Sequence, residues 1–264
     1  MENRAAKMKL PEHNNTQLDF IALFSNTLTQ YQALFPSVFA TAFLGIFSAG
    51  LISSINSEGE ASVLSGELIF LAAIIPATIS EAAVIALVSI IRKGASSSIS
   101  NAYFFVFLLA PRLLIPSILL AIFVRVFQVA TIEIPFLIFL VLPMLLFIVA
   151  RTALYVPVVL LENPRTPTSV ISLVNPVFRS NALVKGKTLK TLGYLAPSLL
   201  VAGILPLLIS GAVESAGINQ VGILLAVSIS SALIQPYVFI LSLLIYEKYA
   251  AAETESTELD LSEI

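Results

Sequence analysis

The sequence predicts an all-α membrane protein with several transmembrane helices, and three observations support this. Of the 264 residues, 58% are hydrophobic and 11% are charged, whereas soluble domains carry about 25% charged residues. The apolar residues form stretches long enough to span a bilayer, whose core of about 30 Å needs roughly 20 helical residues. Runs such as PFLIFLVLPMLLFIVA lack the in–out alternation of membrane β-strands. The six predicted helices are residues 34–57, 67–92, 103–127, 134–161, 191–213 and 219–246.

The distribution of lysine and arginine predicts how the helices thread the membrane. Of the 14 basic residues, all except Arg125 fall on one side of the predicted spans. The connections on the other side carry Glu58, Glu60, Glu133 and Glu214. Because Lys and Arg are enriched in cytoplasmic loops, we expect both termini in the cytoplasm. The expected location is the cell inner membrane.

The connection at 162–190 predicts an amphipathic helix in the plane of the membrane. On a helical wheel one side carries Val170, Val174, Val177, Phe178 and Val184, and the other carries Ser172, Asn175, Arg179, Lys187 and Lys190. Thr166-Pro167 indicates a helix start, Asn175-Pro176 a kink or restart, and Gly186 a break. Such a helix places cations near anionic headgroups, so Arg179, Lys187 and Lys190 are candidate lipid contacts. The alternative is an ordinary cytoplasmic loop that happens to be helical.

Three similar hexamers predict an internal repeat. LFPSVF begins at residue 34, LAPRLL at 109 and LAPSLL at 195, each after a polar or amphipathic cytoplasmic segment. Each unit is then an in-plane segment followed by a transmembrane hairpin, with chance similarity as the alternative. We divide the chain into a polar tail (1–15), a six-helix domain (16–249) and an acidic disordered tail (250–264).

Four polar residues fall inside the predicted spans at comparable depth. They are Glu81, Arg112, Arg151 and Gln235. An ionisable residue within a span costs roughly 2.5–3.5 kcal/mol on insertion scales, so each needs a reason. One hypothesis is a polar pocket in which Glu81 pairs with Arg112 or Arg151. The other is a structural ion pair that fixes the bundle, with the arginines reaching toward the headgroups.

The segment from 140 to 200 resembles a known family. Its features are Pro143, the run PVVLLE at 157–162, the stretch from Ser180 to Gly186, and Leu195 to Pro197. In this pattern the chain resembles the YciC-type bacterial inner-membrane proteins. It is more distantly similar to membrane domains fused to some glycerophosphodiester phosphodiesterases. The resemblance implies a six-helix inner-membrane protein and carries over no catalytic residue.

The chemistry available to the chain favours a non-enzymatic role. It has no cysteine, one histidine in the polar N-terminal region and two aspartates, Asp19 and Asp260. No metal-binding, phosphate-binding or nucleophile motif is present, so we expect no cofactor and no metal. The expected partners are membrane lipids and an unidentified membrane or cytosolic protein, with no nucleic acid. Two functions remain open: a lipid-associating scaffold or accessory subunit, and a small-solute or lipid transporter.

Overall fold

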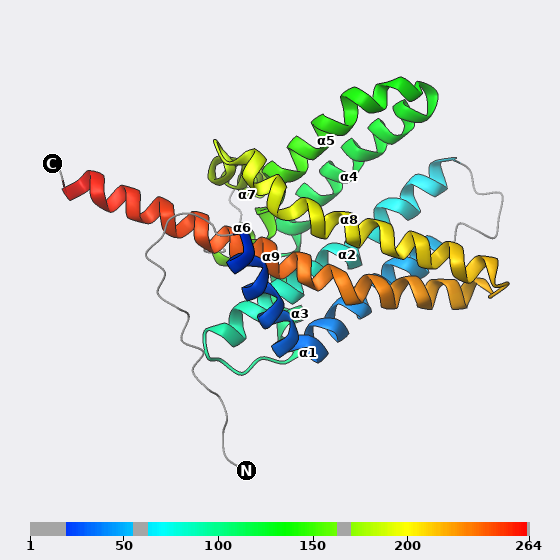
Figure 1. The fold of residues 1–264 in the computed structure, drawn as a ribbon, viewed down its shortest axis with the longest axis horizontal. Helices are drawn as coiled ribbons and strands as arrows, with labels where there is room; N and C mark the ends of the chain where they lie inside the picture. Colours follow the sequence, from blue (N-terminus) through cyan, green and yellow to red (C-terminus); the bar gives the residue numbers. More distant parts are fainter. Residues whose placement is uncertain (1–19, 55–62, 163–169, 263–264) are drawn as a thin grey trace, which may run out of the picture.

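The computed structural model describes residues 20–54, 63–162 and 170–262, and these are almost entirely helical (Figure 1). No strand occurs in these ranges, which confirms the predicted all-α class. The elements in chain order are α1 (Phe20–Ser54), α2 (Val63–Arg92), α3 (Ile99–Leu108), α4 (Ala110–Glu133), the 3₁₀ turn η2 (Pro135–Leu137), α5 (Ile138–Thr152), α6 (Tyr155–Leu161), α7 (Val170–Val184), α8 (Thr188–Ser215) and α9 (Gln220–Ser262).

Six helical segments are long and apolar enough to cross a membrane, as predicted. They are Phe20–Ser54, Gly66–Arg92, Ala110–Glu133, Ile138–Leu161, Thr188–Ser215 and Gln220–Glu255. Many of their large apolar side chains are exposed on the outside of the bundle, which water would not tolerate over so large an area. The chain is a multi-pass membrane protein.

The six spans form three hairpins whose tips lie on one side of the molecule. In Figure 1 the tips of α1–α2, α4–α5 and α8–α9 all lie toward the right, and the C-terminus lies at the left. A short helix precedes the second and third hairpins: α3 comes before α4, and α7 before α8. In the first unit α1 is one continuous helix that changes direction along its length and contains Pro36. Proline lacks the N–H that an interior helix position needs, and is a common cause of such bends.

Two of the predicted spans are interrupted. The third was predicted to begin at residue 103, but α3 ends at Leu108 and α4 begins at Ala110, with a proline in its first turn. The fourth breaks between α5 and α6, where Pro157 cannot donate a hydrogen bond to the carbonyl of Ala153. At this break the Ser180 hydroxyl of α7 donates to the carbonyl of Arg151 (2.8 Å) and accepts from the N–H of Leu154 (3.2 Å).

Helix α7 forms within the predicted connection. Pro176, Ser180, Leu183 and Val184 are buried, whereas Phe178, assigned to the apolar side, is exposed. The wheel did not include Ser180, whose hydroxyl bonds to the broken backbone between α5 and α6. Pro176 lies inside an uninterrupted helix, so the predicted restart does not occur. The predicted break at Gly186 is confirmed by its φ of 77°, a left-handed conformation that favours glycine. The helix start predicted at Thr166-Pro167 lies outside the described residues.

The C-terminal segment from 250 continues α9 to Ser262, so its prediction as a disordered tail was wrong. The segment begins with consecutive alanines, which have the highest helix propensity. It also extends an existing helix, so it avoids the unfavourable nucleation step that an isolated acidic peptide would face.

The core is formed where α1, α2 and α9 pack together, away from the hairpin tips. Helices α1 and α2 approach each other closely at Gly45: a Cβ added there would lie 2.1 Å from the Cβ of Ser80. Hydroxyls of two other helices bond to the backbone of α1, because Ser80 of α2 donates to the carbonyl of Thr41 (3.2 Å) and Tyr103 of α3 donates to the same carbonyl (2.7 Å). Small residues and polar contacts of this kind hold transmembrane helices together.

Candidate functional site

The candidate site is a partly open groove of about 380 Å³ between α4, α5, α6 and α7, named the α4–α7 groove. This volume is near the lower end of the range for small-molecule sites, about 300–1,000 Å³. Two of its lining residues, Thr152 and Tyr155, carry a hydroxyl, and the others are apolar. The lining residues are Pro116, Leu119, Leu120, Phe123, Ile148, Thr152, Tyr155, Val174, Val177 and Phe178.

Both hydroxyls of the groove are already hydrogen-bonded within the protein. Thr152 donates to the carbonyl of Ile148, four residues earlier in α5 (2.9 Å). The hydroxyl of Tyr155 shares a short hydrogen bond with that of Ser117, a buried residue of α4. Ser117 lies one turn after Leu113 and also donates to its carbonyl (2.8 Å). The groove therefore presents a surface with few free polar groups.

Glu81 lies in α2 and is partly buried. It interacts electrostatically with Tyr155, which lines the α4–α7 groove. Among the described residues, Glu81 forms no ion pair with Arg112 or Arg151. The pairing predicted from their similar depth was wrong, because residues at the same depth can face different neighbours around a bundle.

The two arginines have separate surroundings. Arg151 of α5 donates to the side-chain oxygens of Asn181 (2.6 Å) and Thr188 (3.3 Å), and its guanidinium lies over the ring of Phe147 at 4.7 Å. Arg151 therefore connects α5 to α7 and α8. The Nε of Arg112 is buried without a hydrogen-bond partner in the described part of the chain.

Gln235, the fourth residue of the predicted cluster, lies in α9. It is partly buried. Its neighbour in sequence, Pro236, lies inside α9. The four residues come from α2, α4, α5 and α9, and no hydrogen bond recorded in the described ranges joins any two of them.

Arg179, predicted to contact lipid, is held in an ion-pair network on α9. It donates to Glu162 after α6 (2.9 Å) and to Glu253 of α9. The hydroxyl of Tyr246 donates to the same Glu162 (3.2 Å). The hydrogen bond to Glu253, followed by the interactions with Glu162, raises the pKa of the Arg179 guanidinium. Its charge is thus offset by two carboxylates, and the prediction of a lipid contact treated it as free.

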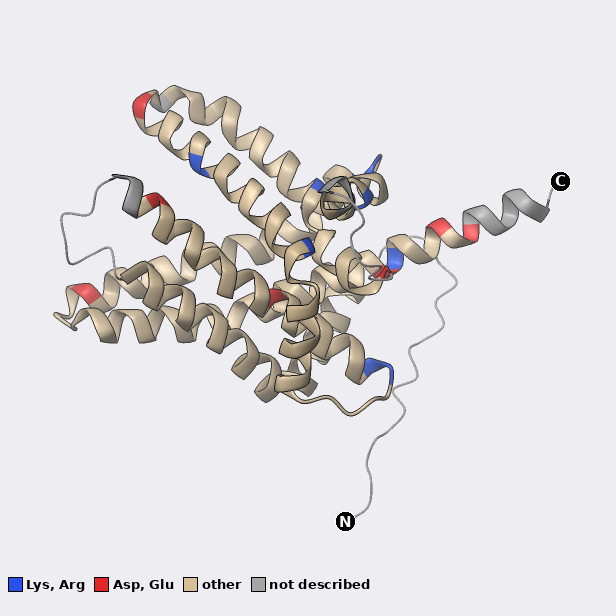
Figure 2. Ribbon diagram, turned by 180° about the vertical axis from the view of Figure 1, so that it is seen from behind, with Lys and Arg blue, Asp and Glu red and all other residues tan. Residues whose placement is uncertain are grey.

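The two lysines predicted with Arg179 differ from each other. Lys187 lies over the ring of Tyr249 at 4.5 Å, and the Tyr249 hydroxyl is hydrogen-bonded to that of Thr191 (3.0 Å). Lys190 and the neighbouring Lys185 are exposed. These exposed lysines lie near the ends of α7 and α8 opposite the hairpin tips, the side where Figure 2 shows most of the described basic residues.

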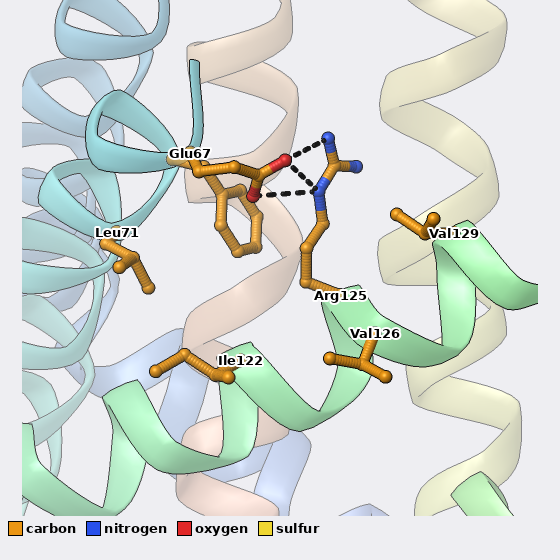
Figure 3. Close-up of a pocket in the computed structure, with 7 residues that line it drawn as sticks. Glu67, Leu71, Ile122, Arg125, Val126 and Val129 are labelled. Atoms are coloured by element: carbon orange, nitrogen blue, oxygen red, sulfur yellow. Dashed lines mark hydrogen bonds and ion pairs between the residues drawn. The ribbon is translucent and has the colours of Figure 1, made fainter. Parts of the chain in front are cut away.

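Sequence reasoning missed a second charged site, between Glu67 of α2 and Arg125 of α4 (Figure 3). The guanidinium donates to both carboxylate oxygens at 3.1–3.2 Å. Arg125 lies in the half of α4 that leads to the hairpin tip, whereas Arg92, Arg112 and Arg151 lie near the opposite ends of their helices. A lone cation in that position needs a nearby acid, and this reasoning could have led to Glu67.

Within the described residues, no group of three or more His, Asp or Glu side chains could hold a metal ion. Comparison of the chain with known protein families, curated protein sequences and solved structures found no match.

Proposed function

We propose that the protein is a non-enzymatic, lipid-associating membrane protein, a scaffold or accessory subunit that holds a membrane lipid in the α4–α7 groove. One observation carries the proposal: the groove is apolar, partly open and built from two spanning segments, α4 and α5–α6, together with the amphipathic helix α7. An acyl chain is the ligand that the bilayer supplies at such a surface.

The state of the groove hydroxyls supports an apolar ligand over a polar solute. Thr152 and Tyr155 already have partners. A polar solute in the groove would lose its hydration without gaining hydrogen bonds, which is unfavourable. An acyl chain has no such requirement.

Exposed lysines near the groove support an anionic headgroup. Phe178 lines the groove, and Lys185 follows seven residues later, about 10 Å away at 1.5 Å per helical residue. Each cation near an anionic surface contributes about 1 kcal/mol. Lys185 and Lys190 therefore replace Arg179 as the predicted headgroup contacts.

Native mass spectrometry of protein purified in mild detergent tests the proposal. We expect bound phospholipid on the wild type and at least a fivefold lower occupancy in Leu120→Trp, whose indole would fill the groove. The matched control is Leu207→Trp, because Leu207 is exposed on α8 and does not line the groove. Equal lipid occupancy in both variants would contradict the site. A second protein chain that remains bound would identify the partner of a scaffold.

The headgroup is tested with the double variant Lys185→Gln, Lys190→Gln. We expect it to retain lipid but to lose its preference for anionic over zwitterionic phospholipid. An unchanged preference would remove the lysines from the site while leaving the acyl-chain groove in place.

The alternative function, a small-solute or lipid transporter, is favoured by the lack of an ion pair at Glu81. An unpaired carboxyl within a span is a common feature of transport pathways. Glu81→Gln would abolish flux in proteoliposomes if the protein transports, while thermal unfolding shows that the fold survives. Wild-type vesicles without flux of lipid or solute would argue against this alternative.

We further propose that both termini face the cytoplasm of a cell with an inner membrane. The basic residues away from the hairpin tips support this orientation. A reporter fused after Ser57 should be active only outside the cytoplasm, and cytoplasmic activity there would reverse the orientation.

A further inference from the structure

A second groove of about 380 Å³ lies between α2 and α4, on the hairpin-tip half of the molecule, and is named the α2–α4 groove (Figure 3). The Glu67–Arg125 ion pair forms its polar part. The guanidinium also donates to Gln128 (3.3 Å) and lies 5.6 Å from the ring centre of Phe70. The rest of the lining is aliphatic: Leu71, Ile122, Val126 and Val129.

The ion pair is accessible from outside the protein. The side chains of Arg125 and Glu67 are 40% and 36% exposed. The α4–α5 hairpin extends away from the remaining helices (Figure 1), and the lining residues Ile122, Val126 and Val129 are exposed. Its apolar lining faces the region that lipid chains occupy. A ligand from the bilayer can therefore reach a positive and a negative group together with an aliphatic surface.

Charge complementarity selects the headgroup. A purely anionic headgroup would be attracted by Arg125 and repelled by Glu67. A purely cationic headgroup would be attracted by Glu67 and repelled by Arg125. A zwitterionic headgroup that carries an ammonium group matches both charges, because phosphate accepts well from guanidinium and ammonium donates well to carboxylate.

We propose that the α2–α4 groove binds an amine-headed zwitterionic phospholipid from the leaflet at the hairpin tips, which the sequence predicts to be the outer leaflet. The phosphate accepts hydrogen bonds from Arg125, the ammonium group donates to Glu67, and one acyl chain lies on Ile122, Val126 and Val129. This site is separate from the α4–α7 groove and does not depend on the function proposed for it.

The test is competition between two lipids. Purified full-length protein in mild detergent is incubated with equal amounts of phosphatidylethanolamine and phosphatidylglycerol, and native mass spectrometry measures the ratio of the two bound lipids. The competition is run in the Leu120→Trp background, in which the α4–α7 groove and its proposed preference for anionic lipid are removed. There we expect phosphatidylethanolamine to be favoured. Glu67→Gln leaves Arg125 as the charge of the site, so the ratio should shift toward phosphatidylglycerol by at least fivefold. Arg125→Gln should lower the occupancy of both lipids.

The matched control is Glu247→Gln. Glu247 forms the other ion pair made by α2, with Arg92 at the opposite end of that helix (2.6 Å), and its loss should leave the lipid ratio unchanged. A ratio unaffected by Glu67→Gln, or shifted equally by Glu247→Gln, would overturn the proposal and leave Glu67–Arg125 as a structural ion pair.

A second variant keeps the test valid if the charge variants fail to fold. Val126 is exposed toward the groove, and Val126→Trp would cover its aliphatic surface while the ion pair remains. We expect this variant to lose one bound phosphatidylethanolamine per chain. Retention of that lipid would overturn the site. Leu120→Trp, which fills the α4–α7 groove, should leave this lipid bound. Loss of lipid from one groove can therefore be distinguished from loss of lipid from the other.

Discussion

Two leucines in spans of similar hydropathy have opposite surroundings. Leu241 of α9 is 0% exposed, whereas Leu140 of α5 is 71% exposed. Leu241 lies in the packed end of the bundle, and Leu140 lies in the α4–α5 hairpin that extends away from it (Figure 1). The difference teaches that hydropathy places a helix in the bilayer but does not determine whether it packs against other helices.

The packed end is distinguished by contacts that lipid cannot provide. There a glycine brings α1 and α2 together, and the hydroxyls of Ser80 and Tyr103 connect α2 and α3 to the backbone of α1. Lipid chains solvate a leucine as well as another leucine does, so close backbone approach and hydrogen bonds decide which helices associate. The following predictions test this contrast.

Gly45→Leu should have the largest effect. The first added carbon would lie 2.1 Å from the Cβ of Ser80 and 2.7 Å from the carbonyl oxygen of Pro76, so α1 and α2 must separate. We expect a loss of about 3 kcal/mol, the upper end of typical overpacking costs, measured by thermal unfolding in detergent. Gly203→Leu on α8 is the control, because no atom lies within 4 Å of a Cβ at that position. Helix propensity favours leucine over glycine, so it predicts no loss at either position. Equal losses would therefore contradict the explanation by packing between α1 and α2.

The next largest effect on stability is expected from alanine substitutions of the two leucines, Leu241 and Leu140. Leu241→Ala leaves a cavity in the buried core, and we expect a loss of about 2 kcal/mol, the lower end for buried Leu→Ala changes. In Leu140→Ala, lipid contacts the side chain in both the folded and the unfolded state, so stability should not change. Unfolding in SDS measures both variants. A comparable loss at Leu140 would mean that the α4–α5 hairpin packs against a partner.

The sequence predicted the parts of this structure that depend on composition. Six spans, the all-α class and the break at Gly186 follow from apolar run length and from one residue with special backbone freedom. The partner of Arg151 and the pairing of Glu67 with Arg125 depend on how helices rotate about their axes. The burial of Ser180 could not be predicted from the residues of α7, because it is explained by the helix break between α5 and α6.

Ser180→Ala tests this hydrogen-bonded break. The change leaves the carbonyl of Arg151 and the N–H of Leu154 without the Ser180 hydroxyl. We expect a loss of about 1–2 kcal/mol, in the range for buried unsatisfied polar groups, again by thermal unfolding. Ser215→Ala is the control, since its hydroxyl is exposed and bonds within its own helix. An unchanged melting temperature for Ser180→Ala would show that water or a local rearrangement satisfies the break.

The two ion pairs of α2 should have the smallest effects on stability, and they compare the two ends of one helix. Glu247→Gln removes the partner of Arg92 beside the packed core. As for other surface ion pairs, we expect at most about 1 kcal/mol, reduced further in high salt because ions screen exposed charges. Glu67→Gln should leave the melting temperature nearly unchanged while it changes lipid preference. Melting curves at low and high salt, recorded beside the lipid ratios, separate these effects. If Glu67→Gln destabilised the protein more than Glu247→Gln, the pair at the hairpin tips would hold α4 to α2, and the contrast between a packed end and a lipid-facing end would fail at this position.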